Sequence, residues 1–165
     1  MNVEIRNETA ADVSVIDAVT IAAFLDAPHT SHTEQLIVEG LRKAGQLNVS
    51  LVAEVEGQIV GHVAVSPVSI SDGAGGWFGL GPISVLPEYQ RRGVGSGLMR
   101  EALTALQRQG AAGCVVLGEP EFYGRFGFRA DADLVLPGVP TEYFQAVAFG
   151  AARARGVVSY HVAFA

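Results

Sequence analysis

The chain has 165 residues, a length that favours one domain spanning residues 1–165. Hydrophobic residues make up 49% of it and charged residues 17%, a composition that excludes a disordered chain. Its formal net charge of −6 argues against the broad basic surface that nonspecific nucleic-acid binding requires, so we expect no DNA or RNA partner.

The sequence also bears on the compartment of the protein. Its apolar runs are too short to cross a bilayer, and the N-terminus carries acidic residues where a signal peptide would have basic ones. The single cysteine, Cys114, cannot form an internal disulfide and lies in an apolar run typical of a buried strand. We therefore expect a cytoplasmic protein with no membrane partner.

The N-terminal segment predicts one strand followed by two helices. Residues 3–6 alternate as a strand, and apolar residues at helical spacing follow, with Thr9 as the candidate N-cap. A second amphipathic helix is predicted over 33–44. Its inward-facing residues should be Leu36, Ile37 and Leu41.

The middle of the chain predicts a hairpin and then a strand–helix–strand unit. Residues 50–70 form two β-rich runs joined at Glu56-Gly57. The next strand, WFGLGPISVL, contains Gly79, Gly81 and Pro82, which predict a bulge or a break in pairing. An amphipathic helix over 94–109 and the uncharged strand GCVVLG complete a unit with two parallel strands.

The C-terminal part predicts a short helix and further strands. Pro120 suits the first turn of a helix that extends through Phe126. FRADADLVL and YFQAVAF are predicted as the last two strands of the sheet. The tail VVSYHVAFA is an eighth strand or an extended segment, and it either pairs across subunits in a homodimer or covers the sheet.

The stretch LPEYQRRGVGSGL places alternating glycines at the start of the predicted helix. Glycines there expose backbone N–H groups to an anion such as phosphate, and Arg91 and Arg92 could add charge-assisted hydrogen bonds. The P-loop is excluded because the only lysine is Lys43. The dinucleotide fingerprint GxGxxG is excluded because Leu98 occupies the position of its third glycine.

Three motifs in this order carry a resemblance to a known family. Gln90, Gly93 and Gly95 satisfy QxxGxG, GPISVLPEY precedes them, and EFYGRFGF follows. With these motifs the chain resembles the GNAT superfamily of N-acetyltransferases over nearly its whole length, as a bacterial-type single-domain member. The resemblance implies an α/β (α+β) fold with a mixed, mostly antiparallel sheet of about seven strands. Helices should cover both faces, and the parallel pair at the fourth and fifth strands should be splayed.

The same resemblance implies acetyl-CoA as cosubstrate and no metal. Backbone groups around Ile83, Ser84 and Val85 would pair with the pantetheine arm as an added strand. The pyrophosphate would lie on the loop and helix N-terminus that follow Gln90. The residues implied there are Arg91, Arg92, Gly93, Val94, Gly95 and Ser96.

Acetyl transfer to an amine requires an acid for the leaving thiolate, an oxyanion donor and a route for the amine proton. The resemblance assigns the acid to Tyr123 and the oxyanion donor to the backbone N–H of Val85. The strand that carries a base in several relatives offers no ionisable side chain here. Glu121 is therefore the candidate base, with Glu119, His62 and a water relay as alternatives.

The acceptor is expected to be a primary amine of a small molecule or peptide, approaching from the side of the first two helices. His29 and His32 lie between those helices and are candidate acceptor-site residues. Their HxxH spacing lacks the further ligands that a metal site needs. Two alternatives stay open: a non-catalytic sensor of acyl-CoA, and a nucleotide-binding module.

Overall fold

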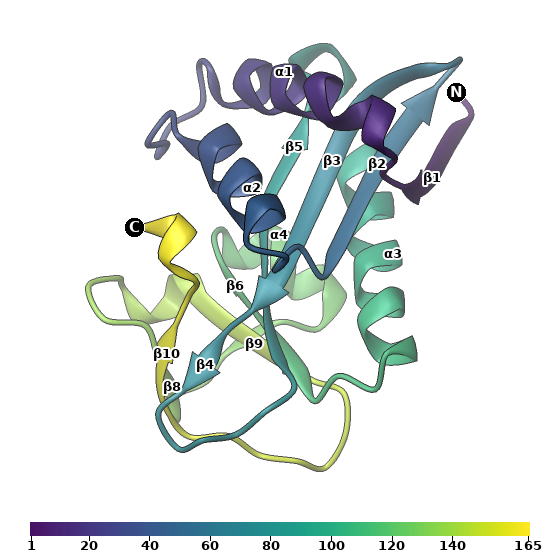
Figure 1. Ribbon diagram of the computed structural model, residues 1–165. Helices are drawn as coiled ribbons and strands as arrows, with labels where there is room; N and C mark the ends of the chain where they lie inside the picture. Colours follow the sequence, from purple (N-terminus) through teal and green to yellow (C-terminus); the bar gives the residue numbers. More distant parts are fainter.

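The computed structural model describes all 165 residues, and its centre is a seven-stranded sheet in the order β1-β2-β3-β5-β6-β9-β7 (Figure 1). Every neighbouring pair in this sheet is antiparallel except β5 and β6, which are parallel. The predicted mixed sheet with one parallel pair is thus confirmed. Its strands are β1 (Val3–Asn7), β2 (Val49–Val55), β3 (Gln58–Pro67), β5 (Trp77–Val85), β6 (Gly113–Leu117), β7 (Arg129–Ala130) and β9 (Phe144–Ala148).

A second sheet of three short strands has the order β4-β10-β8. It consists of β4 (Ser69–Ile70), β8 (Leu134–Val135) and β10 (Gly156–Ser159). The prediction that FRADADLVL forms one strand was wrong, because this segment contributes β7 to the large sheet and β8 to the small one. The tail does supply an extra strand, and a short 3-10 helix over Val162–Phe164 follows it.

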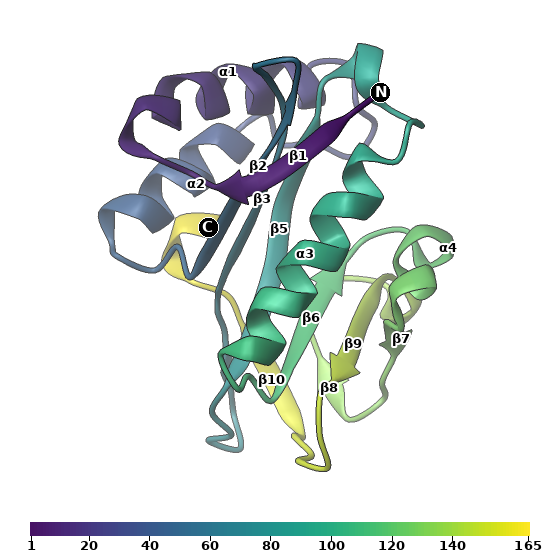
Figure 2. The same cartoon turned by 90° about the vertical axis from the view of Figure 1, so that its right-hand side faces the viewer.

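Helices cover both faces of the large sheet. Figure 2 shows α1 (Val13–Phe24) and α2 (Glu34–Lys43) on one side, and α3 (Val94–Arg108) and the one-turn helix α4 (Pro120–Tyr123) on the other. Inside the sheet each strand sends alternate side chains to the two faces. Val63, for example, belongs to the core beneath α3, whereas Ala64 packs with residues of α1 and α2.

One inward-facing residue of α2 was predicted wrongly. Leu36 is exposed, whereas Val38 and Leu41 are the apolar residues that α2 buries. Apolar residues occupy positions 36, 37 and 38 in a row, so helical spacing alone does not choose among them. The packing of α2 against the sheet puts Val38 inside and leaves Leu36 in solvent.

The predicted irregularity in β5 is present as a bulge. Val63 of β3 pairs with Ile83, and Val65 pairs with Leu80, so Gly81 and Pro82 together lie opposite a single residue. Below the bulge, β5 pairs with β6 only over Trp77–Gly79. Beyond Gly79 the parallel strands therefore separate, as the resemblance implied, and the edge of β5 that faces β6 is left open.

No helix of the protein is both long and apolar enough to cross a membrane.

Candidate active site

The open edge of β5 exposes the backbone groups of two residues. The N–H of Leu86 donates to the carbonyl of Val60 at 2.8 Å, and antiparallel ladders alternate between bonded and non-bonded pairs. By this alternation Ser84 bonds to His62, whereas Ile83 and Val85 form non-bonded pairs with Val63 and Gly61. The N–H and C=O groups of Ile83 and Val85 therefore point away from β3, toward the gap beside β6.

The loop after β5 adopts a conformation that gathers backbone N–H groups. Arg91 has a φ of 63° and Gly93 has a φ of 86°, so two left-handed residues flank Arg92. Such alternation turns successive N–H groups toward one point and forms an anion-binding concavity. Glycine at position 93 adopts this left-handed conformation without the steric strain that a side chain would add.

Helix α3 adds the donors of its first turn. Its first intrahelical bond here runs from the N–H of Gly97 to the carbonyl of Gly93 at 3.0 Å. The N–H groups of Val94, Gly95 and Ser96 precede that bond and have no helical partner. The positive end of the helix dipole coincides with these donors, so the same place favours a negative charge.

Gln90 connects the loop to the strand. Its side-chain Nε2 donates to the carbonyl oxygen of Val85 at 3.0 Å. This bond uses the carbonyl of Val85 that faces the gap and leaves the N–H of the same residue free. The glutamine of the QxxGxG pattern therefore fixes the position of the loop relative to the open strand edge.

The open strand edge and the loop line one cavity of about 590 Å³, here called the loop cavity. Seven of the ten residues predicted to bind the cosubstrate line it, and two further residues from the α4 region complete its wall. The nine residues are Ile83, Val85, Gln90, Arg91, Gly93, Gly95, Ser96, Phe122 and Arg125.

Three predicted cosubstrate residues do not line the loop cavity. The hydroxyl of Ser84 is buried and has no hydrogen-bond partner. The side chains of its neighbours Ile83 and Val85 face α3, so that of Ser84 faces the opposite side of the sheet. Val94 is buried in the core beneath α3. The guanidinium of Arg92 lies 5.7 Å from the ring centre of Tyr89, so this arginine packs on the turn.

A second cavity, here called the apolar cavity, has a volume of about 540 Å³ and lies on the other side of Ile83. Ile83 lines both cavities. Of the 15 lining residues 10 are hydrophobic, and they come from segments far apart in the sequence. They are Phe24, Glu34, Leu80, Gly81, Pro82, Ile83, Leu117, Tyr123, Leu136, Pro137, Val139, Val158, Ser159, Tyr160 and Phe164.

Tyr123, the predicted acid, belongs to the wall of the apolar cavity. Its neighbour Phe122 lines the loop cavity. The ring of Tyr123 contacts Phe122 edge-to-face at 5.0 Å, and a side chain at Gly118 would collide with it. Burial raises the pKa of the Tyr123 phenol to about 12, so the hydroxyl stays protonated at neutral pH.

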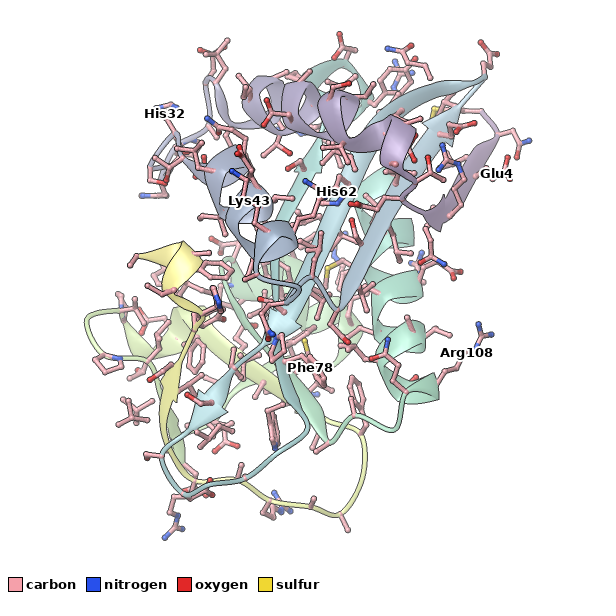
Figure 3. The ribbon with its side chains drawn as sticks, viewed as in Figure 1. Glu4, His32, Lys43, His62, Phe78 and Arg108 are labelled. Atoms are coloured by element: carbon pink, nitrogen blue, oxygen red, sulfur yellow. The ribbon has the colours of Figure 1, made fainter.

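The predicted base candidates line neither cavity. Glu119 and Glu121 are exposed, at the start of α4. His62 is fully buried between the sheet and the N-terminal helices (Figure 3). Its Nε2 lies 2.8 Å from the hydroxyl of Ser50, which in turn donates to Glu8.

The two histidines predicted near the acceptor are at the surface. His29 and His32 are exposed, and Figure 3 shows His32 on the outside of the loop between α1 and α2. No group of three or more side chains suited to a metal ion includes them. The same loop ends at Glu34, a residue that the sequence reasoning passed over and that does line the apolar cavity.

Cys114 is fully buried in β6, and burial raises the pKa of its thiol well above the ordinary range. A thiol in this state is not a nucleophile at neutral pH, because the thiolate is the reactive form. The predicted core position of Cys114 is confirmed.

Comparison with known families agrees with this geometry. The model of the family described as an acetyltransferase (GNAT) domain matches residues 46–130, which include the hairpin, β5, the loop, α3 and α4. Among curated proteins, the uncharacterized N-acetyltransferase YhbS of Escherichia coli (strain K12) is 40% identical over 118 residues. The match covers 71% of each chain.

Two crystal structures are similar over 99% of this chain. A GNAT family acetyltransferase from Brucella melitensis, solved in complex with acetyl-CoA, is 45% identical with a TM-score of 0.89 and is covered over 99% of its length. YhbS from E. coli, solved in complex with CoA, is 35% identical with a TM-score of 0.87 and is covered over 92%.

Proposed function

Because the chain belongs to the GNAT family of acetyltransferases, we propose that it transfers the acetyl group of acetyl-CoA to a primary amine by direct attack in a ternary complex. The observation that carries the proposal is the joint lining of one cavity by the open edge of β5 and the N-terminus of α3. The acetyl-CoA and CoA bound in the two similar crystal structures support the same cosubstrate here.

In this proposal the loop cavity holds the cosubstrate. The free backbone groups of Ile83 pair with the amides of the pantetheine arm, which acts as an added strand, and the N–H of Val85 remains for the reacting end of the cosubstrate. The pyrophosphate binds the N–H groups of the loop and of the first turn of α3. Arg91 and Arg125 supply positive charge at the cavity wall.

The apolar cavity holds the amine. Because Ile83 lines both cavities, the two ligands would meet beside this residue. Direct attack needs both bound at once, and it needs no covalent enzyme intermediate. The buried, protonated thiol of Cys114 argues against an acyl-cysteine route.

The reaction requires charge stabilisation at two atoms. The neutral amine attacks the thioester carbonyl, and the free N–H of Val85 donates to the oxyanion that forms. When the intermediate collapses, the C–S bond breaks and the Tyr123 hydroxyl donates to the leaving thiolate. The proton of the acceptor leaves to water, because Glu119 and Glu121 line neither cavity and cannot accept it directly.

The test is an amine panel assayed for release of the free CoA thiol, alongside calorimetric titration of acetyl-CoA. Alkylamines, amino acids, polyamines, aminoglycosides, peptide N-termini and lysine peptides cover the main classes. We expect acetyl-CoA to bind and at least one class to be acetylated. If acetyl-CoA binds but no amine of the panel causes release of CoA, the protein would instead be a sensor of acyl-CoA.

A further inference from the structure

A single charged side chain lies in the wall of the apolar cavity. Glu34 is the only Asp, Glu, Lys, Arg or His among the 15 lining residues. It is 9% exposed, and it begins α2 at the end of the loop that follows α1. An acidic side chain so deeply buried needs hydrogen bonds or a cationic partner to offset the loss of its hydration.

One oxygen of Glu34 has such partners and the other has none. Oε2 accepts from the hydroxyl of Thr30 at 2.6 Å and from the backbone N–H of Ser31 at 3.2 Å. Oε1 is buried and makes no hydrogen bond. The loop therefore holds the carboxylate in place through one oxygen and leaves the other available to a ligand of the adjoining cavity.

The charge on this carboxylate is retained. Burial raises the pKa of Glu34, but the hydrogen bonds from Thr30, the backbone and Ser31 lower it by more, so that the net pKa lies below the ordinary value. No basic residue of the protein forms an ion pair with Glu34. The carboxylate is thus ionised at neutral pH without a protein cation beside it.

The remaining wall determines what kind of cation fits. Ten of the 15 lining residues are hydrophobic, including Phe24 and Phe164 at opposite ends of the sequence. The hydroxyl of Tyr160 is also buried without a hydrogen-bond partner in a residue that lines the cavity, so it can serve a polar group of the ligand. A carboxylate on the ligand would meet no basic residue in the wall and would be repelled by Glu34. A second ammonium on the ligand would lose its hydration and would find no second acidic residue to offset that cost.

From these observations, and resting on the proposed function, we infer that the acceptor is an apolar monoamine without a carboxylate, held through its ammonium by Glu34 Oε1. The cavity of about 540 Å³ accommodates an aromatic or branched aliphatic body. Glu34 acts in this inference as a binding residue: it holds the ammonium, which loses one proton to water before the neutral nitrogen attacks the thioester carbonyl. Amino acids, polyamines and aminoglycosides are excluded as good acceptors by their additional charges.

The test compares two probes that share a body and differ in one group. Phenethylamine carries one ammonium on an apolar ring, and phenylalanine adds a carboxylate to the same frame. With the wild-type protein we expect kcat/KM for phenethylamine to exceed that for phenylalanine by about tenfold or more. This comparison needs no variant, so it stands even where a substitution harms folding.

The variant Glu34→Gln keeps the size of the side chain and removes its charge. We expect it to raise KM for phenethylamine about tenfold with a smaller change in kcat, while the Kd of acetyl-CoA stays unchanged. Glu39→Gln is the matched control, since Glu39 is an exposed acid on the same helix that pairs with Lys43. Its kinetics should equal those of the wild type.

The outcomes separate the inference from the proposed function. Equal use of phenylalanine and phenethylamine, or an unchanged KM in a folded Glu34→Gln variant, would overturn the inference and leave the acetyltransferase intact. If no amine is acetylated, calorimetric titration of phenethylamine decides the inference alone. Binding to the wild type and tenfold weaker binding to Glu34→Gln would support it, and equal binding or none would overturn it.

Discussion

Gln90 and Val85 join two parts of the site through one hydrogen bond of 3.0 Å from side chain to backbone carbonyl. The bond ties the loop that we propose for the pyrophosphate to the strand edge that we propose for the pantetheine arm. We predict that Gln90→Ala raises the Kd of acetyl-CoA about three- to tenfold, because one neutral hydrogen bond contributes about 1 kcal/mol. Calorimetric titration measures this change.

The control for that variant is Gln107→Ala, an exposed glutamine of α3 that lines neither cavity. Gln107→Ala should unfold at the wild-type temperature because its side chain is exposed, and Gln90→Ala should lose at most about 1 kcal/mol, the contribution of its one hydrogen bond. An unchanged Kd in Gln90→Ala would show that the loop keeps its position without the bond.

A substitution of Gly95 should change cosubstrate binding without lowering stability. It lies in the first turn of α3 and lines the loop cavity, and a methyl group there would touch Val85 and Phe122 only at ordinary contact distances of 3.8 and 3.9 Å. Gly95→Ala should therefore leave unfolding unchanged or stabilise the helix by up to about 1 kcal/mol. The same methyl group should weaken acetyl-CoA binding, as calorimetry would show. Loss of stability together with affinity would contradict this prediction.

Tyr123→Phe removes the hydroxyl that we assign to the leaving thiolate. We expect kcat to fall about a hundredfold with little change in the Kd of acetyl-CoA or in the unfolding temperature. Tyr143→Phe, at an exposed tyrosine that lines neither cavity, is the control and should behave as the wild type. Unchanged turnover in a stable Tyr123→Phe protein would exclude the acid role.

The pH profile gives a second test of Tyr123. A pKa raised to about 12 keeps the phenol protonated throughout the range in which the enzyme can be assayed. The ratio of wild-type to Tyr123→Phe kcat should therefore stay constant from about pH 7 to about pH 10. If the phenol had the ordinary pKa of about 10, half of it would be deprotonated at about pH 10 and the ratio of the two kcat values would fall by about half.

His62 makes stability depend on pH. Burial lowers its pKa from 6.5 to about 4, Glu8 opposes that shift, and Arg42 adds to it. The unfolded chain therefore binds a proton between these two values and the folded protein does not, so stability falls as the pH falls. From pH 7 to pH 4 this residue should cost about 3 kcal/mol of unfolding free energy.

Urea unfolding of the wild type and of His62→Gln at both pH values measures this cost. The variant lacks the titrating group, so its stability should decrease less on acidification. Carboxylates that titrate in this range and do not contact His62 are common to both proteins and cancel in the comparison. Parallel losses in the two proteins would show that His62 does not titrate as described.

The parts of the fold that could be predicted are those specified by neighbouring residues. The Glu56-Gly57 turn, the bulge at Gly81 and Pro82, and the limits of α3 follow from local turn and helix preferences. The division of FRADADLVL into β7 and β8 depends on partners far along the chain, since β7 pairs with β9 and β8 with β10. Local preference contains no information about those partners.

The two cavities of the site also differ in how far local sequence predicts them. The loop cavity is built mainly from one continuous stretch, and most of its residues could be predicted, whereas Phe122 and Arg125 approach it only through the packing of α4. The apolar cavity draws on segments from Phe24 to Phe164. The spacing of Ser31 and Glu34 allows the bond from the backbone N–H of Ser31 to the Glu34 carboxylate, although Thr33 and not Ser31 is the N-cap of α2. This spacing does not predict that the other carboxylate oxygen lacks a partner.

The bulge in β5 has a consequence for how this chain can change in length. Leu80 and Ile83 face the same side of the sheet although they are three positions apart, because the bulge adds one residue between them. Deleting Gly81 or Pro82 would leave one residue opposite Ala64, so the ladder would become regular and Ile83 and Val85 would keep their pairing with Val63 and Gly61. The bend that the bulge puts into β5 would be lost, and with it a cause of the separation of β5 from β6 beyond Gly79. Loops such as 72–76 can lose or gain residues at the surface, whereas this short stretch must keep its length to hold the two strands apart.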